Sequence, residues 1–408
     1  MKFIYLCGPT VYDKVHIGNM RPIVTFDIFI RAMKKLGENV TLIHNITDID
    51  DKIIVKSQET MTSEAEISNT YYSFYKDMLS QYNVNTIIDM PRVTENMDLI
   101  IKSIKDLIKK KKAYVSGSVY FDIKSIPSYG SLSKNKISHV KNELKDINKR
   151  NPEDFVIWKL KDSGLSWDSP WGKGRPGWHT ECFSFIENFG QGKVNIHGGG
   201  IDLKFPHHEN ENAQFISLYD DEITNKWIHI GLINFKGQKM SKSENNFLYA
   251  DDFLNIQSSH HNSDIFRLMI LNSHYKNTIE FTDSIYLDTS KKLNSIVKIF
   301  NILSVEDNFV FSNLLNIRDI LELVKDLNFS AAMKEINKKI KVFNETKNIK
   351  EGNELISIFK VLGFHFTDKL ISENDKHIYR LWREQTKLKN WKRSDELRNQ
   401  IAHIFGQK

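Results

Sequence analysis

The opening of the chain constrains its fold more than any other segment. Phe3–Leu6 is a short apolar run typical of a buried strand, and the polar stretch CGPTVYDKVHIGN follows it. Helical apolar spacing then extends over Met20–Leu36 and ends at Gly37, and Val40–Ile46 is a second apolar run. A strand, a helix and a second strand joined by so short a crossover predict the first unit of an α/β nucleotide-binding fold.

Polar and acidic side chains gather where these first elements end. His16 and Asn19 stand at the start of the predicted helix, where unpaired N–H groups and the positive end of the helix dipole suit a phosphate. The second strand runs into NITDIDDK, residues 45–52, at the edge where parallel sheets hold ligands. Asp50 and Asp51 are also expected to cap the helix that follows.

Beyond this opening the sequence predicts a mixture of helices and strands as far as about residue 250. The expected helices are Glu64–Tyr82, Glu95–Lys112 and 207–219, and the expected strands are Tyr114–Ile123, Asn195–His197 and Trp227–Ile233. The polar, lysine-rich segment Ser125–Asn151 has no regular periodicity and is predicted to be a mobile insertion.

After residue 250 the apolar spacing is helical throughout. The predicted helices are Asp283–Leu303, Leu314–Phe343, Gly352–Leu362, Glu373–Leu388 and Trp391–Phe405. Consecutive helices with short connections pack as antiparallel neighbours, so this part of the chain is predicted to be an all-α bundle.

The segment Gly174–Gln214 concentrates side chains that bind metals. It holds Cys182, which is one of two cysteines in the chain, together with four of the fourteen histidines. Pro206 favours a helix start directly after it. His207 and Glu211 would then project from one face of that helix, one turn apart, where an imidazole and a carboxylate can hold the same ion.

Thiolates from Cys182 and Cys7 would complete a set of four ligands. Two cysteines, a histidine and a glutamate around a tetrahedral ion are typical of zinc. In the alternative interpretation the cysteines are small buried apolar residues and the histidines cap or line a helix. The spacing leaves both open, since no loop length ties Cys7 to Cys182. Within the same segment, Gly198–Gly200 is expected to form a tight turn.

The composition describes a globular protein. At 408 residues the chain is long enough for two or three domains, and no apolar run reaches the roughly 18 residues of a membrane span, so no membrane partner is expected. The N-terminus lacks the apolar core of a signal peptide, and two cysteines suit a reducing compartment, so a cytoplasmic protein is expected. The net charge of +6 permits a nucleic-acid partner without requiring one.

A second candidate site follows the last predicted strand. The turn Phe235–Gln238 precedes the segment KMSKS, residues Lys239 to Ser243. Two lysines and two hydroxyls beside a glycine-containing turn suit a polyanion, because lysine is a mobile point charge and serine donates alongside it. The alternative is an ordinary exposed loop, and no Walker or GxGxxG phosphate motif occurs elsewhere.

Taken in order, these motifs resemble one family. HIGN at His16–Asn19 resembles the HIGH signature of class I aminoacyl-tRNA synthetases, and Lys239–Ser243 matches their KMSKS signature. CGPTVYD, NITDIDDK, GRPGWHTEC and HGGGIDLKFPHHENE are similar to motifs of the cysteinyl-tRNA synthetase family within that class. The resemblance covers roughly residues 1–300, and the closing WKRSDELR fits the C-terminal bundle of the family.

The resemblance implies an α/β fold with a Rossmann-like parallel-sheet catalytic domain, an inserted domain and an all-α helical bundle. The first half of the catalytic domain would be 1–92, the inserted acceptor-end domain 93–170 and the second half 171–235. The KMSKS loop and stem-contact region would be 236–300, and the tRNA-binding helical bundle 301–408.

The resemblance also implies roles for single residues. The implied zinc ligands are Cys7, Cys182, His207 and Glu211. The implied catalytic residues are His16, Asn19, Lys239 and Lys242, and the implied ATP-binding residues are Thr10, His16, Gly18, Asn19 and Lys242. The implied cysteine-binding residues are Gly8, Thr10, Thr47, Trp178, His197 and Asp202. His16 would stabilise the phosphates as the adenylate forms, and Lys242 would neutralise the leaving pyrophosphate.

The implied activity is ATP-dependent activation of L-cysteine and its transfer to the 3′ end of tRNA-Cys. One zinc ion per chain would select the cysteine thiolate, Mg²⁺ would accompany ATP, and the protein would be a monomer. Serine is nearly isosteric with cysteine, and a plain pocket separates such pairs by only about 1–3 kcal/mol, whereas a bond to zinc favours the thiolate strongly.

Two departures from the family pattern bear on this expectation. Asn19 replaces the second histidine of HIGH, so it keeps hydrogen-bonding capacity without a positive charge. The sequence ends soon after WKRSDELR, so how an anticodon would be read is not predicted. The runner-up is a paralogous ligase of mycothiol synthesis, with a similar core, which joins cysteine to an amino sugar without tRNA. An inactive tRNA- or zinc-binding relative is a third alternative.

Overall fold

The structure is a computed structural model that describes residues 1–135, 147–161, 164–190, 192–240, 246–258, 261–369 and 371–405. The chain divides into two compact units. The first comprises Met1–Ile23, Asn39–Met78 and Thr86–Leu232, and the second comprises Val24–Glu38, Leu79–Asn85 and Ile233–Lys408. Each unit is therefore assembled from three separate stretches of sequence.

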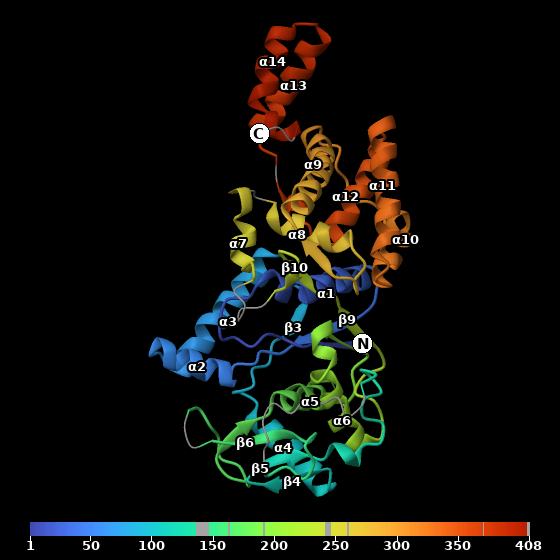
Figure 1. The fold of residues 1–408 in the computed structure, drawn as a ribbon. Helices are drawn as coiled ribbons and strands as arrows, with labels where there is room; N and C mark the ends of the chain where they lie inside the picture. The colour runs from blue at the N-terminus through green and yellow to red at the C-terminus, as the bar shows by residue number, and fades with distance from the viewer. Residues whose placement is uncertain are drawn as a thin grey trace. The chain divides into compact units, whose positions relative to one another are not determined.

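A five-stranded parallel sheet forms the centre of the first unit (Figure 1). Its strands are β1 (Lys2–Leu6), β2 (Val40–His44), β3 (Ile87–Asp89), β8 (Ile196–Gly200) and β9 (Trp227–Ile230), in the order β3-β2-β1-β8-β9. The last three residues of β1 are buried, as in a parallel sheet covered on both faces. The strand order reverses at β1, and such sheets bind ligands beyond the carboxyl ends of the strands at this point.

The helices of this unit follow the strands. They are the start of α1 (Ile17–Lys35), α2 (Asp51–Thr60), most of α3 (Glu64–Gln81), α4 (Met97–Lys109), α5 (Trp178–Phe189) and α6 (His207–Tyr219). Apolar side chains of α4, α5 and α6 share one buried core with β1, and Ile100, Phe183 and Phe215 belong to it. This core fixes α5 and α6 against the sheet.

A second sheet in the first unit is antiparallel. Its strands, in the order β4-β5-β6-β7, are β4 (Ala113–Ser116), β5 (Ser118–Phe121), β6 (Phe155–Leu160) and β7 (Gly174–Pro176). Asp154 is fully buried at the start of β6 and accepts hydrogen bonds from the Tyr114 hydroxyl at 2.7 Å and the Ile123 amide at 3.1 Å. These bonds satisfy a buried carboxylate and hold the ends of the sheet together.

The second unit consists of a small sheet and a series of helices. The sheet has the order β11-β10-β12, with β10 (Ile233–Phe235), β11 (Gln238–Lys239) and β12 (Ile279–Phe281). The helices that follow β11 in the chain are α7 (Ala250–Leu254), α8 (Asn262–Leu271), α9 (Asp283–Val305), α10 (Leu314–Lys325), α11 (Phe329–Thr346), α12 (Ile349–Val361), α13 (Glu373–Lys387) and α14 (Trp391–Gln400). Helices α10, α11 and α12 pack side by side (Figure 1).

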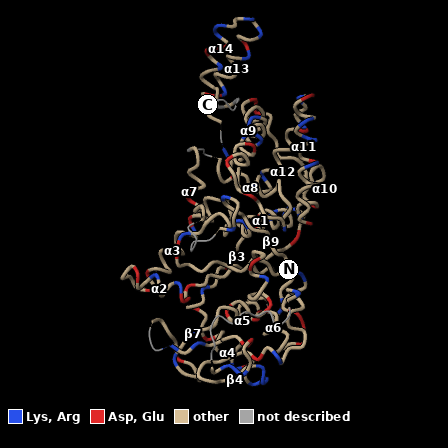
Figure 2. The backbone as a smooth tube through the Cα atoms, in the orientation of Figure 1, with Lys and Arg blue, Asp and Glu red and all other residues tan. Residues whose placement is uncertain are grey.

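Short 3₁₀ turns connect several of these elements, at Ile123–Ser125, Ile201–Lys204, Ile256–Ser258, His365–Asp368 and Ala402–Phe405. Lys and Arg are interspersed with Asp and Glu along both units (Figure 2). In the described part of the chain, none of the helices combines the length and the apolar character that crossing a bilayer requires.

The predicted fold class is confirmed, because a parallel α/β sheet, an additional sheet between its halves and a helical C-terminal region are all present. Most helix predictions hold to within a few residues at each end, including 207–219, which is α6. The predicted cap at Asp50 is also confirmed, since its carboxylate accepts a hydrogen bond from the Lys52 amide. Residues 136–146 of the predicted insertion lie outside the described residues.

Two strand predictions are wrong because the chain reverses or leaves the sheet within them. Tyr114–Ile123 is a hairpin of β4 and β5, and the turn at Gly117 has a φ of +70°, a conformation that glycine adopts without strain. Trp227–Ile233 is divided between β9 in the parallel sheet and β10 in the small sheet of the second unit. A continuous apolar run does not show which sheet it pairs with.

Three further predictions need correction. Gly198–Gly200 lies in β8 and is not a turn, because its backbone pairs with β9. The helix predicted over Leu314–Phe343 is broken into α10 and α11 at Leu327, whose φ is +58°, and Asn328 caps the second helix through the Ala331 amide. The region after residue 250 is not entirely helical, since β12 pairs in parallel with β10.

Candidate metal centre and active site

Four predicted metal ligands converge at the carboxyl end of the parallel sheet. Cys7 follows β1 directly, Cys182 lies on α5, and His207 and Glu211 lie one turn apart on α6. Their ligand atoms all lie within 4.8 Å of one another. Because β1 is central and the shared core holds α5 and α6 in place, residues as many as 204 positions apart meet at one point.

The distances between these atoms are short. Cys7 Sγ lies 3.8 Å from Cys182 Sγ, 3.5 Å from His207 Nε2 and 3.7 Å from Glu211 Oε1. His207 Nε2 lies 2.7 Å from Glu211 Oε1. Cys182, His207 and Glu211 are buried and Cys7 is partly buried. Two sulfurs, an imidazole nitrogen and a carboxylate oxygen in a small polar space fit a tetrahedral zinc ion.

Mutual contact shifts the pKa values of these groups away from their ordinary range. Burial opposes charge on His207, but the Glu211 carboxylate and Cys182 raise the pKa of His207 to about 10. Burial would raise the pKa of Glu211, but the charges of His207 and His197 hold it well below its usual range. Without a metal, the centre therefore contains an ion pair between the imidazolium of His207 and the carboxylate of Glu211.

The two cysteines differ from one another in protonation. Burial, followed by the neighbouring Cys182, raises the pKa of the Cys7 thiol well above its ordinary value. Burial would also raise the pKa of Cys182, but hydrogen bonds from Cys7 and His207 lower it to about 6. One thiolate is therefore present before any metal binds, and the adjacent thiol supports it as a donor.

A layer of further histidines surrounds the four residues. His197 Nε2 lies 2.5 Å from the second oxygen of Glu211, and His208 Nε2 lies 3.5 Å from Cys7 Sγ. His208 Nδ1 in turn lies 2.9 Å from His229 Nε2 on β9. These contacts create a second set of donors within reach of one ion, namely Cys7, His197, His208 and Glu211.

The sequence motifs do not predict His208, His229 and Glu181 as residues of the site, although all three belong to it. Glu181 is buried, its pKa is raised well above the usual range by burial and then by Cys182, and it accepts a hydrogen bond from Thr47 Oγ1 at 3.1 Å. His208 stands beside a predicted ligand in the sequence, which is a weak signal. Glu181 has the same weak signal, because it directly precedes Cys182. His229 has no such signal, because only the pairing of β8 with β9 brings it to the centre.

Most of the predicted cysteine-binding residues border this centre. Thr10 and Thr47 are paired by a backbone bridge, and the Gly8 amide donates to Asn45 Oδ1 at 2.9 Å. The Trp178 ring stacks on His207 with a centroid distance of 4.2 Å and is 42% exposed, so one face of the centre is accessible. His197 belongs to the histidine layer.

Asp202 is placed differently from the other predicted cysteine-binding residues. It lies on the exposed 3₁₀ turn Ile201–Lys204, between β8 and α6. The structure therefore brings it to the same strand end, on the turn that leads to α6.

The HIGN segment forms a reciprocal cap at the start of α1. The His16 amide donates to Asn19 Oδ1 at 3.1 Å, and the Asn19 amide lies 3.3 Å from His16 Nδ1. This is the arrangement of a capping box, in which two backbone donors at a helix start are satisfied by each other's side chains. Asn19 thus has a defined structural role in place of a histidine. Gly18 is the second residue of α1 and lies between the two capping residues in the sequence.

The predicted catalytic lysines belong to the second unit. Lys239 is the last residue of β11 and is exposed. Lys242 lies in the segment 241–245, outside the described residues.

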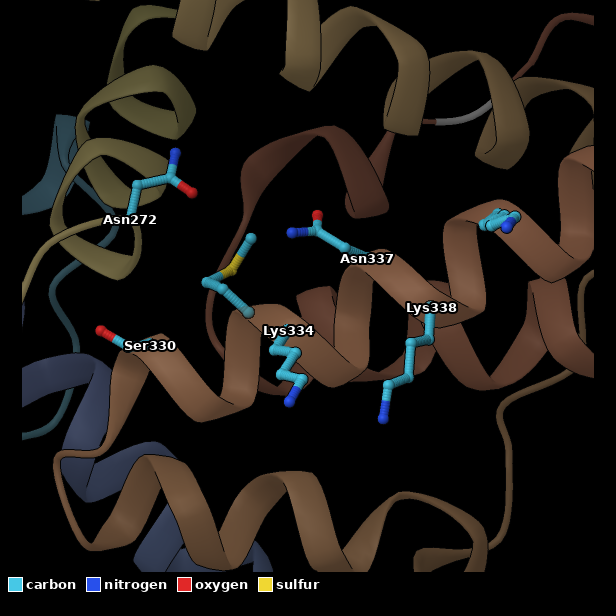
Figure 3. Close-up of a pocket in the computed structure, with 7 residues that line it drawn as sticks. Asn272, Ser330, Lys334, Asn337 and Lys338 are labelled. Carbon is cyan, nitrogen blue, oxygen red and sulfur yellow. The ribbon is translucent and has the colours of Figure 1, made fainter.

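A separate basic groove lies on α11 in the second unit (Figure 3). Its volume is about 540 Å³, and its lining includes Lys334, Lys338 and Lys341. Lys338 pairs with Glu335 at 2.7 Å, and Lys341 lies 3.9 Å from Glu345. Carboxylates on the same helix therefore offset much of this positive charge.

Solved structures share the fold of this chain. The chain superimposes on a crystal structure of the Agrobacterium radiobacter K84 agnB2 LeuRS-tRNA-LeuAMS ternary complex with a TM-score of 0.66, 11% identity, and coverage of 90% of this chain and 84% of that one. Mycobacterium tuberculosis methionyl-tRNA synthetase in complex with methionyl-adenylate gives a TM-score of 0.62 and 12% identity, covering 89% and 90% of the two chains. The fold is that of class I aminoacyl-tRNA synthetases.

Sequence comparison narrows this class. Residues 2–292 match the family model described as tRNA synthetases class I (C) catalytic domain. The chain is 38% identical to the cysteine–tRNA ligase of Malacoplasma penetrans over 97% of this chain and 93% of the relative, and 38% identical to that of Mesomycoplasma hyopneumoniae over 98% and 97%. The chain belongs to the cysteine–tRNA ligase family, as the resemblance of its motifs predicts, and is an aminoacyl-tRNA ligase.

Proposed function

We propose that this chain activates L-cysteine with ATP and transfers it to the 3′ end of tRNA-Cys. The observation that carries the proposal is the buried cluster of Cys7, Cys182, His207 and Glu211 at the switch point of the parallel sheet. Family membership and full-length similarity to cysteine–tRNA ligases support the same reaction.

The cluster is suited to holding one zinc ion, since two sulfurs, an imidazole nitrogen and a carboxylate oxygen are donors that zinc accepts, and they all lie within 4.8 Å of one another. When bound, the ion would supply a Lewis-acidic position that prefers the thiolate of cysteine to the hydroxyl of serine.

The residues of the chain would do the remaining work by positioning and charge stabilisation. In the first step a carboxylate oxygen of cysteine attacks the α-phosphorus of ATP and pyrophosphate leaves. The start of α1, ordered by the cap between His16 and Asn19, presents its dipole to the phosphates. Lys239 and Lys242 would neutralise the charge on the leaving group, and Mg²⁺ would accompany ATP.

Side chains around the metal centre would orient the amino acid. Trp178 would line the accessible face, where it stacks on His207, and Thr47 is held by Glu181 beside the same space. Gly8, Thr10, His197 and Asp202 would complete the pocket. In the second step a terminal ribose hydroxyl of the tRNA takes the acyl group and releases AMP.

The decisive experiment is attachment of cysteine to a tRNA-Cys transcript by the purified, zinc-loaded protein. Serine and an amino-sugar acceptor are tested in parallel. Charging of the tRNA with cysteine but not serine supports the proposal. Adenylate formation followed by transfer to the amino sugar alone would instead identify the paralogous ligase of mycothiol synthesis.

A further inference from the structure

Three cationic side chains of the first unit converge on one carboxylate, and none of these four residues is a predicted metal ligand. Lys159 Nζ lies 2.5 Å from Asp51 Oδ2, and Arg175 Nη2 lies 2.5 Å from Asp51 Oδ1. Lys161 Nζ is 3.8 Å from the same Oδ1. Asp51 begins α2. Lys159 lies on β6, Lys161 directly follows the last residue of β6, and Arg175 lies on β7. We call this group the Asp51 cluster.

The charge in the Asp51 cluster is not balanced. Three cations face one carboxylate, so the described members carry two positive charges in excess. Burial, followed by the charges of Lys159 and Arg175, lowers the pKa of Lys161, which shows that like charges crowd there. By contrast, Lys339 on α11 is a single cation between Glu351 and Glu354, as in an ion pair that serves packing alone.

Arg175 is built into the fold. It is only 4% exposed, and its Nη1 is buried without a hydrogen-bond acceptor among the described residues. Leaving a buried guanidinium donor unpaired is costly, and the planar fork of arginine matches phosphate oxygens well. The residue therefore anchors Asp51 and keeps a fixed positive charge beside the two more exposed lysines.

The geometry of the sheet arranges the cations in a row. Lys159 is opposite Arg175 in the ladder between β6 and β7. Lys161 continues that ladder through a backbone bond to Lys173 and is two residues beyond Lys159, so both lysines point to the same face. The side chains of Lys159 and Lys161 are 41% and 30% exposed, so this row can be reached from solvent.

The chain connects the cluster directly to the metal centre. Arg175 precedes Trp178 by three residues, and Asp51 follows Thr47 by four. Both of these partners border the metal centre, as their contacts with His207 and Glu181 show. Two members of the cluster are therefore only three and four residues along the chain from side chains that border the candidate metal centre, where the acyl group would be transferred.

We propose that Lys159 and Lys161, supported by the buried charge of Arg175, bind successive phosphates of the single-stranded 3′ end of tRNA and guide it to the candidate metal centre. The inference rests on the proposed function and adds to it the residues that hold this segment. Residues two apart on a strand are separated by roughly 6.6 Å, which suits neighbouring phosphates of an extended strand. A single nucleotide is a poorer fit, because the proposed function already places the phosphates of ATP at the start of α1.

The test is the double variant Lys159→Gln/Lys161→Gln in the zinc-loaded, full-length protein. Its Kd for a tRNA-Cys transcript should rise about five- to tenfold, as expected for two phosphate contacts at the surface. The slope of log Kd against log salt should fall by about 1.4, or roughly 0.7 per lost contact to a single strand. Cysteine-dependent ATP–pyrophosphate exchange, which needs no tRNA, should be unchanged.

Matched variants separate this role from a structural one. Lys159→Arg/Lys161→Arg keeps both charges and should bind tRNA as the wild type does. Lys102→Gln removes the cation of a balanced, exposed pair with Asp106 and should have no effect. If the double variant folds poorly, Lys161→Gln alone is used, since at 3.8 Å its side chain makes no hydrogen bond to Asp51.

Two results would overturn the inference. One is an unchanged tRNA Kd and salt slope in the double variant, which would mean that the cluster only joins α2 to β6 and β7 through ion pairs. The other is a raised KM for ATP in the exchange assay, which would assign the cluster to the nucleotide. Failure of the wild-type protein to activate cysteine would contradict the proposed function itself and is read separately.

Discussion

The chemistry of the metal centre depends on the protonation of single residues. At pH 7 the lowered pKa of Cys182, about 6, leaves it largely as a thiolate, and Glu211 is ionised. The raised pKa values of Cys7 and His207 keep both residues protonated. The metal-free centre is therefore poised with two donors ready for a cation and two that must first lose a proton.

Zinc binding to the metal-free protein should therefore release about two protons per ion at pH 7, one from Cys7 and one from His207. The release should begin to decrease as the pH approaches 10, where about half of His207 is already neutral, and should tend toward one above that pH. Calorimetric titrations in buffers of different ionisation enthalpy measure this number. Release of no protons at pH 7 would contradict the assigned states.

The same shifts determine how the metal-free fold responds to pH. The pKa of His207 is raised from 6.5 to about 10, so its contribution to stability is complete below pH 6.5 and is lost as the pH rises toward 10. Glu211 acts in the opposite sense, since its lowered pKa gives stability that is lost on acidification. Thermal unfolding with a chelator present should show both losses, whereas a flat profile from pH 7 to 10 would contradict the ion pair.

Cys182→Ser should abolish zinc binding and cysteine activation. Loss of an outer partner of a metal ligand already costs about 10- to 100-fold in affinity, so loss of a thiolate ligand should cost more. Metal analysis and cysteine-dependent ATP–pyrophosphate exchange measure the two effects. The control is Ser184→Ala on the same helix, whose buried hydroxyl has no hydrogen-bond partner among the described residues. Unchanged activation in Cys182→Ser would refute the assigned role.

At the scale of elements, the site depends on how closely two backbones approach beyond the ends of β1 and β2. A Cβ on Gly8 would lie 1.6 Å from the backbone oxygen of Asn45. A Cβ on Gly199 in β8 would instead meet side chains of Leu203 and His208 at 2.9 and 3.0 Å. Backbone cannot move aside as a side chain can, so the two glycines are not equivalent.

Gly8→Ala should therefore be more damaging than Gly199→Ala. We expect Gly8→Ala to lower the free energy of unfolding by at least about 1–3 kcal/mol, the usual cost of overpacking, and Gly199→Ala to lower it by less. Because Gly8 adjoins Cys7, zinc content should also fall in the first variant. Denaturant titrations of both variants measure the difference, and equal stability would show that the loop of Asn45 can shift.

At the scale of the whole molecule, one arginine joins three separate stretches of sequence within the second unit. Arg267 on α8 is fully buried and pairs with Asp27 on α1 at 2.7 Å. It also donates to the carbonyls of Tyr82 at 2.8 Å, Asn83 at 2.6 Å and Leu362 at 3.0 Å. The three stretches are thus joined by a buried guanidinium that is paired with a carboxylate and hydrogen-bonded to backbone carbonyls.

Arg267→Met should lower the stability of the protein by about 3 kcal/mol, near the low end for breaking a buried ion pair, because Asp27 keeps its bond to Arg31. Arg318→Met removes an arginine from an exposed pair with Glu322 and should cost less than about 1 kcal/mol. Thermal and denaturant unfolding compare the two. Equal effects would mean that the buried network contributes little.

The sequence alone determined the local elements and the chemistry available to them. Apolar periodicity predicts α1, α6 and most C-terminal helices, and the motifs around Cys182 and His207 predict a zinc-type ligand set. Apolar periodicity failed where one backbone angle redirects the chain, as at Gly117 and Leu327. At Leu327 a leucine rather than a glycine adopts a positive φ.

Only the tertiary structure decided which distant residues meet. Spacing could not tie Cys7 to Cys182, and it gave no sign of His229 or the Asp51 cluster, because these contacts depend on strand order and on how helices pack against the sheet. Local periodicity is set by interactions among near neighbours in the chain, whereas a site at a strand end is set by long-range pairing. That is the physical reason why the elements could be predicted and the full centre could not.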